Sequence, residues 1–170
     1  MTVDDTERIG AAEVKAMARR AHGDATVREV LVSTMLTAEG REARNAAWVL
    51  THLPTADAQH IAAHREALVR LALTTPDTSL RRLSLALLER IPWDLADVRT
   101  DLLDFSLRRL ADPSETYGVR ALCVKLAWLQ CRHYRELQSE LRQTLLLLDP
   151  ATLKPGLKHT WGKVLKQLNP

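Results

Sequence analysis

The stretch VRALCVKL at residues 119–126 has counterparts along the chain at a fixed interval. Its basic residue, Arg120, precedes a run of small and apolar side chains, and basic residues stand 38 positions apart at Arg44, Arg82, Arg120 and Lys158. An apolar residue lies thirteen positions before each of them and another lies six positions after. These eight apolar positions are Leu31, Val69, Leu107, Leu145, Leu50, Leu88, Leu126 and Val164. Self-similarity at such a period indicates a helical repeat protein.

Turn residues recur with nearly the same period. Thr75-Pro76, Asp112-Pro113 and Asp149-Pro150 are spaced by 37 residues, and each fits a helix N-cap followed by proline at the first helical position. Thr37 takes the capping position in the first copy, and Asp112 with Glu115 has the spacing of a capping box. The pattern predicts no strand and nine helices, at about residues 4–22, 25–36, 38–53, 57–74, 76–91, 94–110, 113–130, 134–148 and 152–168.

Composition agrees with an all-α chain. Only 4% of the 170 residues are aromatic and six are glycine, whereas 46% are hydrophobic. A helix pair of this size cannot bury its apolar stripe alone, but stacked pairs can. We therefore predict an all-α superhelix (solenoid) of about four helix pairs plus an N-terminal helix, forming a single domain over residues 1–170.

Several features point to a soluble protein of a reducing compartment. The longest apolar run, Ala46 to Leu50, is far too short for a membrane span, and the acidic start of the chain does not fit a signal peptide. Cys123 and Cys131 point in different directions on one predicted helix, so no disulfide is expected. We expect a cytoplasmic protein, monomeric or weakly oligomeric, with no membrane association.

The repeat unit resembles HEAT-like (armadillo-type) helical repeats over about residues 24–168. The resemblance rests on the turn proline, an acid near the turn, a basic residue at the start of the second helix and the small apolar run after it, best seen at residues 119–122. It implies that the basic column pairs with turn acids, with Asp77 and Asp112 as partners of Arg82 and Arg120. The alternative is that these arginines contact nucleic acid.

A helical wheel of each second helix separates an apolar side from a side with basic residues and two tryptophans. The second helices of solenoids line the concave surface, where partners usually bind. The candidate residues are Arg44, Asn45, Trp48, His52, Arg82, Arg90, Arg120, Trp128, Lys158, His159 and Lys166. The alternatives to a binding role are that Trp48 and Trp128 pack between adjacent helices, and that the C-terminal lysines are simply solvated.

The leading hypothesis is a non-enzymatic binding or scaffold protein that holds a protein or peptide partner on this concave stripe. The runner-up is a nucleic-acid-binding protein related to the HEAT-like DNA alkylation-repair glycosylases, although no matching catalytic set is present. His60 with His64 lacks further metal ligands, and Cys131 near His133 lacks an orienting partner. We therefore expect no catalytic residues, no metal and no cofactor.

Overall fold

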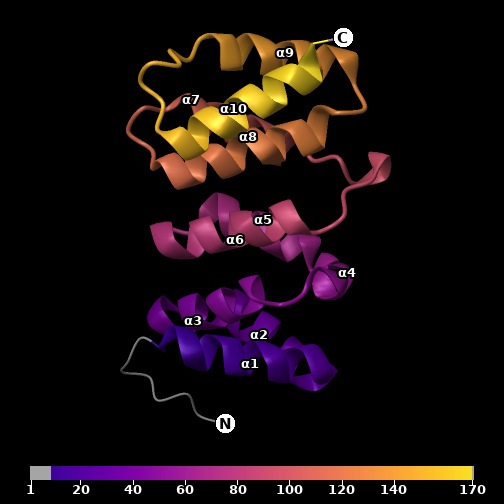
Figure 1. Cartoon of the computed structure of the whole chain (residues 1–170). Helices are drawn as coiled ribbons and strands as arrows, with labels where there is room; N and C mark the ends of the chain where they lie inside the picture. The colour runs from indigo at the N-terminus through magenta and orange to yellow at the C-terminus, as the bar shows by residue number, and fades with distance from the viewer. Residues whose placement is uncertain (1–8, 170) are drawn as a thin grey trace. The chain divides into compact units, whose positions relative to one another are not determined.

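The computed structural model describes residues 9–169, and within this range it contains helices and no strand. The predicted all-α class is confirmed, and Figure 1 shows the helices lying side by side in pairs. The helices are α1 (Ala11–Gly23), α2 (Ala25–Thr37), α3 (Gly40–Thr51), the 3-10 helix η1 (Thr55–Asp57), α4 (Ala58–Ala62), α5 (Arg65–Thr74), α6 (Thr78–Arg90), the 3-10 helix η2 (Leu95–Asp97), α7 (Thr100–Ala111), α8 (Tyr117–Cys131), α9 (Arg135–Leu146) and α10 (Pro155–Leu168).

The chain divides into two compact units, residues 1–92 (unit 1) and 93–170 (unit 2). In unit 1, α2 pairs with α3 and α5 pairs with α6, and the two second helices α3 and α6 pack against each other. In unit 2, α7 pairs with α8 and α9 with α10, and the second helices α8 and α10 again pack together. Each unit therefore contains two stacked helix pairs, as a HEAT-type repeat requires.

The core includes the apolar positions that the repeat singled out. All eight are buried, from Val69 and Leu88 with no exposed surface to Leu107 at 9% exposed. Burying a leucine or valine side chain contributes about 1.5–3 kcal/mol, so these positions are a large part of what holds successive helices together. The 38-residue period is confirmed as a packing period.

The turn prolines do not begin helices, and this part of the prediction is wrong. In all three turns the residue before proline accepts a backbone N–H two residues further on: Thr75 Oγ1 from Asp77, Asp112 Oδ1 from Ser114 and Asp149 Oδ1 from Ala151. Such local bonds close a turn instead of opening a helix. The helices begin later, at Thr78, Tyr117 and Pro155.

Different residues supply the caps. Asp77 accepts from the Leu80 N–H at 2.9 Å at the start of α6, and Thr116 accepts from the Val119 N–H at the start of α8. The capping box expected at Asp112 and Glu115 is absent, because the Glu115 carboxylate binds Arg109 at 3.0 Å.

Three other boundaries differ from expectation. Thr37 belongs to α2, where its hydroxyl donates to Ser33 O, and the turn before α3 instead uses Gly40 with φ +60°. The helix expected at 57–74 is split between α4 and α5, and next to the break Arg65 donates to Pro92 O and His64 Nε2 lies 3.1 Å from the Glu29 carboxylate. The beginning of the helix expected at 4–22 falls on residues 1–8, outside the described residues.

No helix in the described part of the chain combines the length and the apolar character needed to cross a membrane.

Candidate binding surface

Most of the predicted stripe lies on the sides of the second helices, and the structure divides it into exposed and tied residues. We use the name second-helix surface for the predicted residues on α3 and α6 in unit 1 and on α8 and α10 in unit 2. Those exposed to solvent are His52, Arg82, Lys158, His159 and Lys166, and those half-buried are Arg44, Trp48, Arg90 and Trp128. Asn45 and Arg120 are buried, at 9% and 6% exposed.

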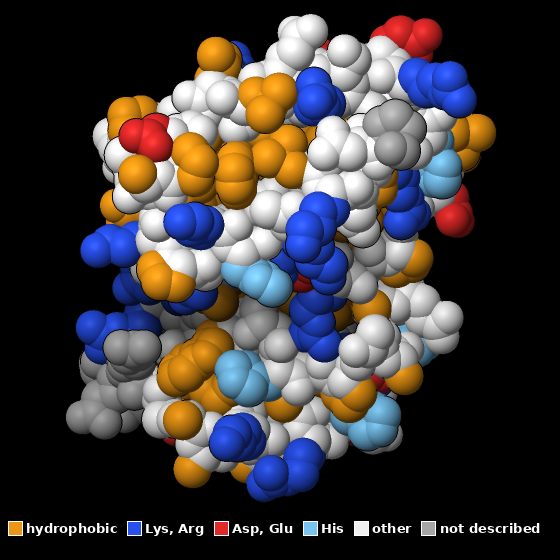
Figure 2. Space-filling view, turned by 45° about the horizontal axis from the view of Figure 1, so that its top comes forward, with side chains coloured by type: hydrophobic (Ala, Val, Ile, Leu, Met, Phe, Trp, Pro, Cys, Tyr) orange, Lys and Arg blue, Asp and Glu red, His pale blue; other side chains and the backbone are white. Residues whose placement is uncertain are grey.

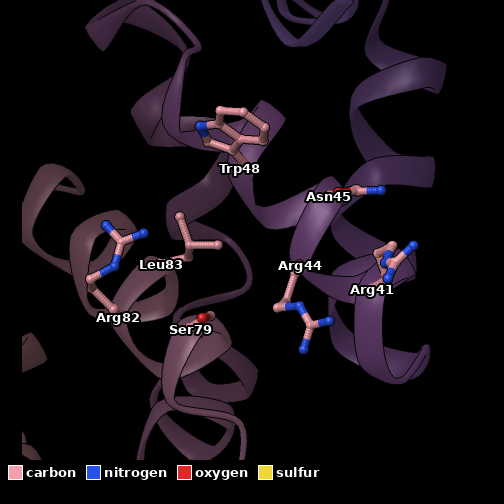
Figure 3. A pocket seen from close by; sticks show the side chains of 7 residues that line it. All are labelled: Arg41, Arg44, Asn45, Trp48, Ser79, Arg82 and Leu83. Atoms are coloured by element: carbon pink, nitrogen blue, oxygen red, sulfur yellow. The ribbon is translucent and has the colours of Figure 1, made fainter. Parts of the chain in front are cut away.

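A pocket of about 440 Å³ opens between α3 and α6 (Figure 3). Trp48 lies at one end, and Ser79 and Arg82 on α6 stand across from the residues on α3. The lining residues are Arg41, Arg44, Asn45, Trp48, Ser79, Arg82 and Leu83. Four residues of the predicted stripe thus surround one space, which we call the α3–α6 pocket.

The three lining residues that the sequence reasoning missed follow the same repeat. Arg41 and Ser79 each lie three residues before the basic position of their repeat, and Leu83 lies one residue after it. A residue three positions earlier lies on the same side of a helix. Extending the wheel by one turn toward the N-terminus of each second helix would have found Arg41 and Ser79.

The strongest polar contact beside the pocket joins the two repeats. Arg44 Nη1 donates to Asp77 Oδ2 at 2.6 Å, so the expected pairing of Asp77 with Arg82 is wrong. Burial alone would raise the pKa of Asp77, but the hydrogen bonds from the Leu80 N–H and from Arg44 outweigh it and lower that pKa. Asp77 is therefore a charged anchor that caps α6 and positions Arg44 at the same time.

Trp48 is held in place by contacts at the C-terminal end of α3. Its ring meets the His52 ring edge-on at a centroid distance of 6.1 Å, and His52 Nδ1 lies 2.9 Å from the Trp48 carbonyl oxygen. The half-buried indole thus forms a fixed apolar wall for the pocket.

Arg90 has a structural role. Its guanidinium donates to the carbonyl oxygens of Thr51, the last residue of α3, and of Leu53, two residues further on. The last carbonyls of a helix lack partners within the helix, and a cation there is favourable. Arg90 therefore caps the preceding second helix.

In unit 2 the basic residue at the repeat position is used differently. Arg120 donates from Nε to Leu110 O at 3.0 Å, and it makes no hydrogen bond to Asp112. The pKa of Asp112 is lowered chiefly by hydrogen bonds from Ser114, with smaller contributions from the charges of Arg109 and Arg120. Arg120 thus closes the end of α7 from inside the unit.

In unit 2, the exposed basic residues of the predicted stripe lie on α10. Lys158, His159 and Lys166 are exposed there, and no acidic residue follows Asp149 in the sequence. Figure 2 shows the side chains coloured by type, and few acidic side chains are visible in this view. A helix that exposes basic side chains and no acidic ones attracts anionic ligands.

Nothing in the described residues resembles a metal or redox centre. No group of three or more His, Cys, Asp or Glu side chains is placed to hold a metal ion in that part of the chain. Both cysteines are buried thiols, and burial raises the pKa of Cys131 to about 12. A thiol of such high pKa is a poor nucleophile at neutral pH.

The repeat geometry and the sequence comparison lead to the same family. The family model described as HEAT repeat domain matches residues 5–168. The chain belongs to the HEAT repeat family. Comparison with curated proteins and with solved structures gave no match. This HEAT repeat domain therefore has the character of a helical-repeat scaffold or binding protein, and its ligand must be argued from its own residues.

Proposed function

We propose that this HEAT repeat domain is a non-catalytic binding module that holds an acidic segment of a protein partner on its second-helix surface. The observation that carries the proposal is the α3–α6 pocket, where Arg44, Trp48 and Arg82 from two successive repeats surround one space. Arginine and tryptophan are the side chains that most often dominate binding energy at protein interfaces. A pocket between repeats is the kind of place where such an anchor inserts.

The basic side chains of α10 support an acidic ligand. Lys158 and Lys166 are exposed on a helix that lacks acidic residues. Exposed charges of this kind accelerate encounter with an oppositely charged partner more than they increase the final affinity. Neutralising them should therefore slow association and weaken its dependence on salt.

A nucleic acid is the competing ligand, because arginines beside an aromatic ring can contact phosphates and stack on bases. The position of Trp48 favours the peptide. Its indole is half-buried and its ring lies against His52, which leaves less of the ring face for a base to stack on. Apolar side chains of a peptide need only the edge of the indole.

The test selects binders from a displayed library of random peptides, with the full chain as bait. A first bait variant reverses three exposed charges of the second-helix surface, Arg82→Glu, Lys158→Glu and Lys166→Glu. A second variant makes the same total charge change on the first helices, at Arg70, Arg108 and Arg135, which are also exposed. We expect acidic peptides to be enriched on the wild type and on the first-helix variant but lost on the second-helix variant.

A parallel gel-shift experiment uses single-stranded and duplex DNA at low salt. Failure to enrich acidic peptides, or equal enrichment on both charge variants, would overturn the proposal. DNA binding that displaces the peptides and weakens steeply with salt would replace it with the nucleic-acid function.

A further inference from the structure

The α3–α6 pocket carries more positive charge than its surroundings neutralise. Its lining includes Arg41, Arg44 and Arg82 and no acidic residue. Asp77 lies beside the pocket and binds Arg44 at 2.6 Å. Arg82 is exposed and makes no hydrogen bond or ion pair with any other residue that the structure describes. The pocket therefore contains a guanidinium that none of the described residues engages.

Other arginines of unit 1 have structural roles, because their guanidinium groups bind backbone carbonyl oxygens. Arg90 donates to two carbonyl oxygens at the end of α3, and the buried Arg28 donates to Ala21 O at 2.8 Å. Each satisfies backbone acceptors that would otherwise lack a partner. Arg82 satisfies none, and cations placed close together on a surface slightly destabilise the folded state. What distinguishes Arg82 from Arg70, another exposed arginine whose side chain has no described partner, is that Arg82 lines the α3–α6 pocket.

The donors around the pocket match the shape of an oxyanion. A guanidinium offers paired N–H groups that bind two oxygens of a carboxylate or a phosphate at once. Arg44 is fixed by Asp77 and retains further N–H groups beyond the one that binds this acid. Ser79, on the first turn of α6, adds a hydroxyl to the same lining.

Another part of the lining is apolar. Trp48 and Leu83 contribute an indole and an isobutyl group, and Figure 3 shows Leu83 between Trp48 and Arg82. A volume of about 440 Å³ lies within the range of small-molecule sites, and it accommodates one or two side chains of a peptide. The lining thus presents an apolar wall next to a cationic one.

We propose that the α3–α6 pocket is an oxyanion-recognition site that takes an anionic side chain of a bound peptide, with Arg82 as its principal ligand, and an adjacent apolar side chain against Trp48 and Leu83. The inference rests on the proposed function, since it names the anchor of the acidic segment. The anion is the carboxylate of Asp or Glu or the phosphate of a phosphorylated Ser or Thr. Both present the planar or tetrahedral oxygens that an arginine pair binds.

The experiment follows NMR signals of the full chain during titration with capped five-residue peptides. One peptide has Leu-Asp-Leu at its centre, the second has phosphoserine in place of Asp, and the third has Asn. The reporters are the Arg82 side-chain N–H and the Trp48 indole N–H, identified with Arg82→Gln and Trp48→Phe. We expect both reporters to shift with the first two peptides, and the Asn peptide to bind about tenfold more weakly. The stronger of the Asp and phosphoserine peptides identifies the source of the anion.

The matched control is Arg70→Gln, because Arg70 is an exposed arginine on α5 in the same unit and does not line the pocket. Arg82→Gln should weaken binding of the acidic peptide about tenfold, and Arg70→Gln should leave it unchanged. Equal effects of the two substitutions, or equal binding of the Asp and Asn peptides, would refute the site. Thermal unfolding of each variant separates lost binding from lost folding.

Failure of the site and failure of the proposed function give different results. If displayed acidic peptides bind but Arg82→Gln and Trp48→Phe have no effect on them, the pocket is not the anchor although the module binds peptides. If no peptide binds, titration with inorganic phosphate still tests the site. Shifts at Arg82 alone in that titration support an oxyanion site, and their absence rejects it.

Discussion

Replacing Asp77 with alanine removes two contacts at once and gives the sharpest test of how the repeats are joined. Asp77 accepts the Leu80 N–H at 2.9 Å as the cap of α6 and binds Arg44 of the preceding second helix at 2.6 Å. Loss of a helix cap costs about 1 kcal/mol. Loss of a partly exposed ion pair costs about 0.5 kcal/mol after solvent screening. The free energy of unfolding should therefore fall by about 1.5 kcal/mol, which lowers Tm by about 3–6 °C in a chain of this size.

Asp77→Ser separates the two contributions, because serine also caps helices but cannot bind Arg44 as an ion. It should cost only about 0.5 kcal/mol. The folded-state pKa of Asp77 is lowered, so its contribution is present above the unfolded-state pKa and disappears as the pH falls through the folded-state value. The difference between wild type and Asp77→Ala should thus be constant near neutral pH and shrink below about pH 4.

Urea unfolding followed by circular dichroism measures both differences. A change smaller than about 0.3 kcal/mol for Asp77→Ala would show that this acid does not join the repeats. The same conclusion follows if Asp77→Ser is as damaging as Asp77→Ala, or if the difference persists unchanged into acid.

Three further predictions concern unit 2. Arg120→Met should lower the free energy of unfolding by about 1.5–3 kcal/mol in urea titrations, because it leaves the Leu110 carbonyl oxygen without its charged donor; a change within about 0.5 kcal/mol would contradict the structural role. Leu126→Ala should cost about 2–5 kcal/mol in the same assay, since Leu126 is fully buried at a repeat position, and an exposed leucine, Leu147→Ala, is the control that should have little effect. Cys131 should resist maleimide labelling in the native state and react only after unfolding, because burial raises its pKa to about 12; rapid labelling of folded protein, read by mass spectrometry, would contradict this burial.

The sequence was sufficient to predict the packing and insufficient to predict the turns. A repeat of 38 residues places Leu50, Leu88 and their counterparts at equivalent positions of stacked helices, and burial follows from that equivalence. At Asp112-Pro113 the same residues fit an N-cap or a local turn, because both use a side-chain oxygen that accepts a nearby N–H. Only the course of the backbone decides between the two.

For a similar reason, the sequence predicted only part of the candidate site. Arg82 and Arg120 occupy the same repeat position, yet one is exposed beside a pocket and the other is buried against Leu110 O. The difference depends on which carbonyl groups the neighbouring helix leaves unpaired, and one helix sequence does not reveal this. Arg44 and Asp77 meet across 33 residues of chain, so their contact depends on tertiary packing.

Apart from Trp48, the residues that line the α3–α6 pocket form pairs 38 positions apart: Arg41 with Ser79, Arg44 with Arg82, and Asn45 with Leu83. None of the eight apolar core positions lines the pocket. In unit 2 the equivalent positions on α8 and α10 hold Tyr117, Arg120, Ala121, Pro155, Lys158 and His159. Gene duplication of such a unit copies these pocket-lining positions together with their scaffold. Each copy can then acquire a different ligand preference by changes at a handful of side chains, while the leucines that hold the helices together stay the same.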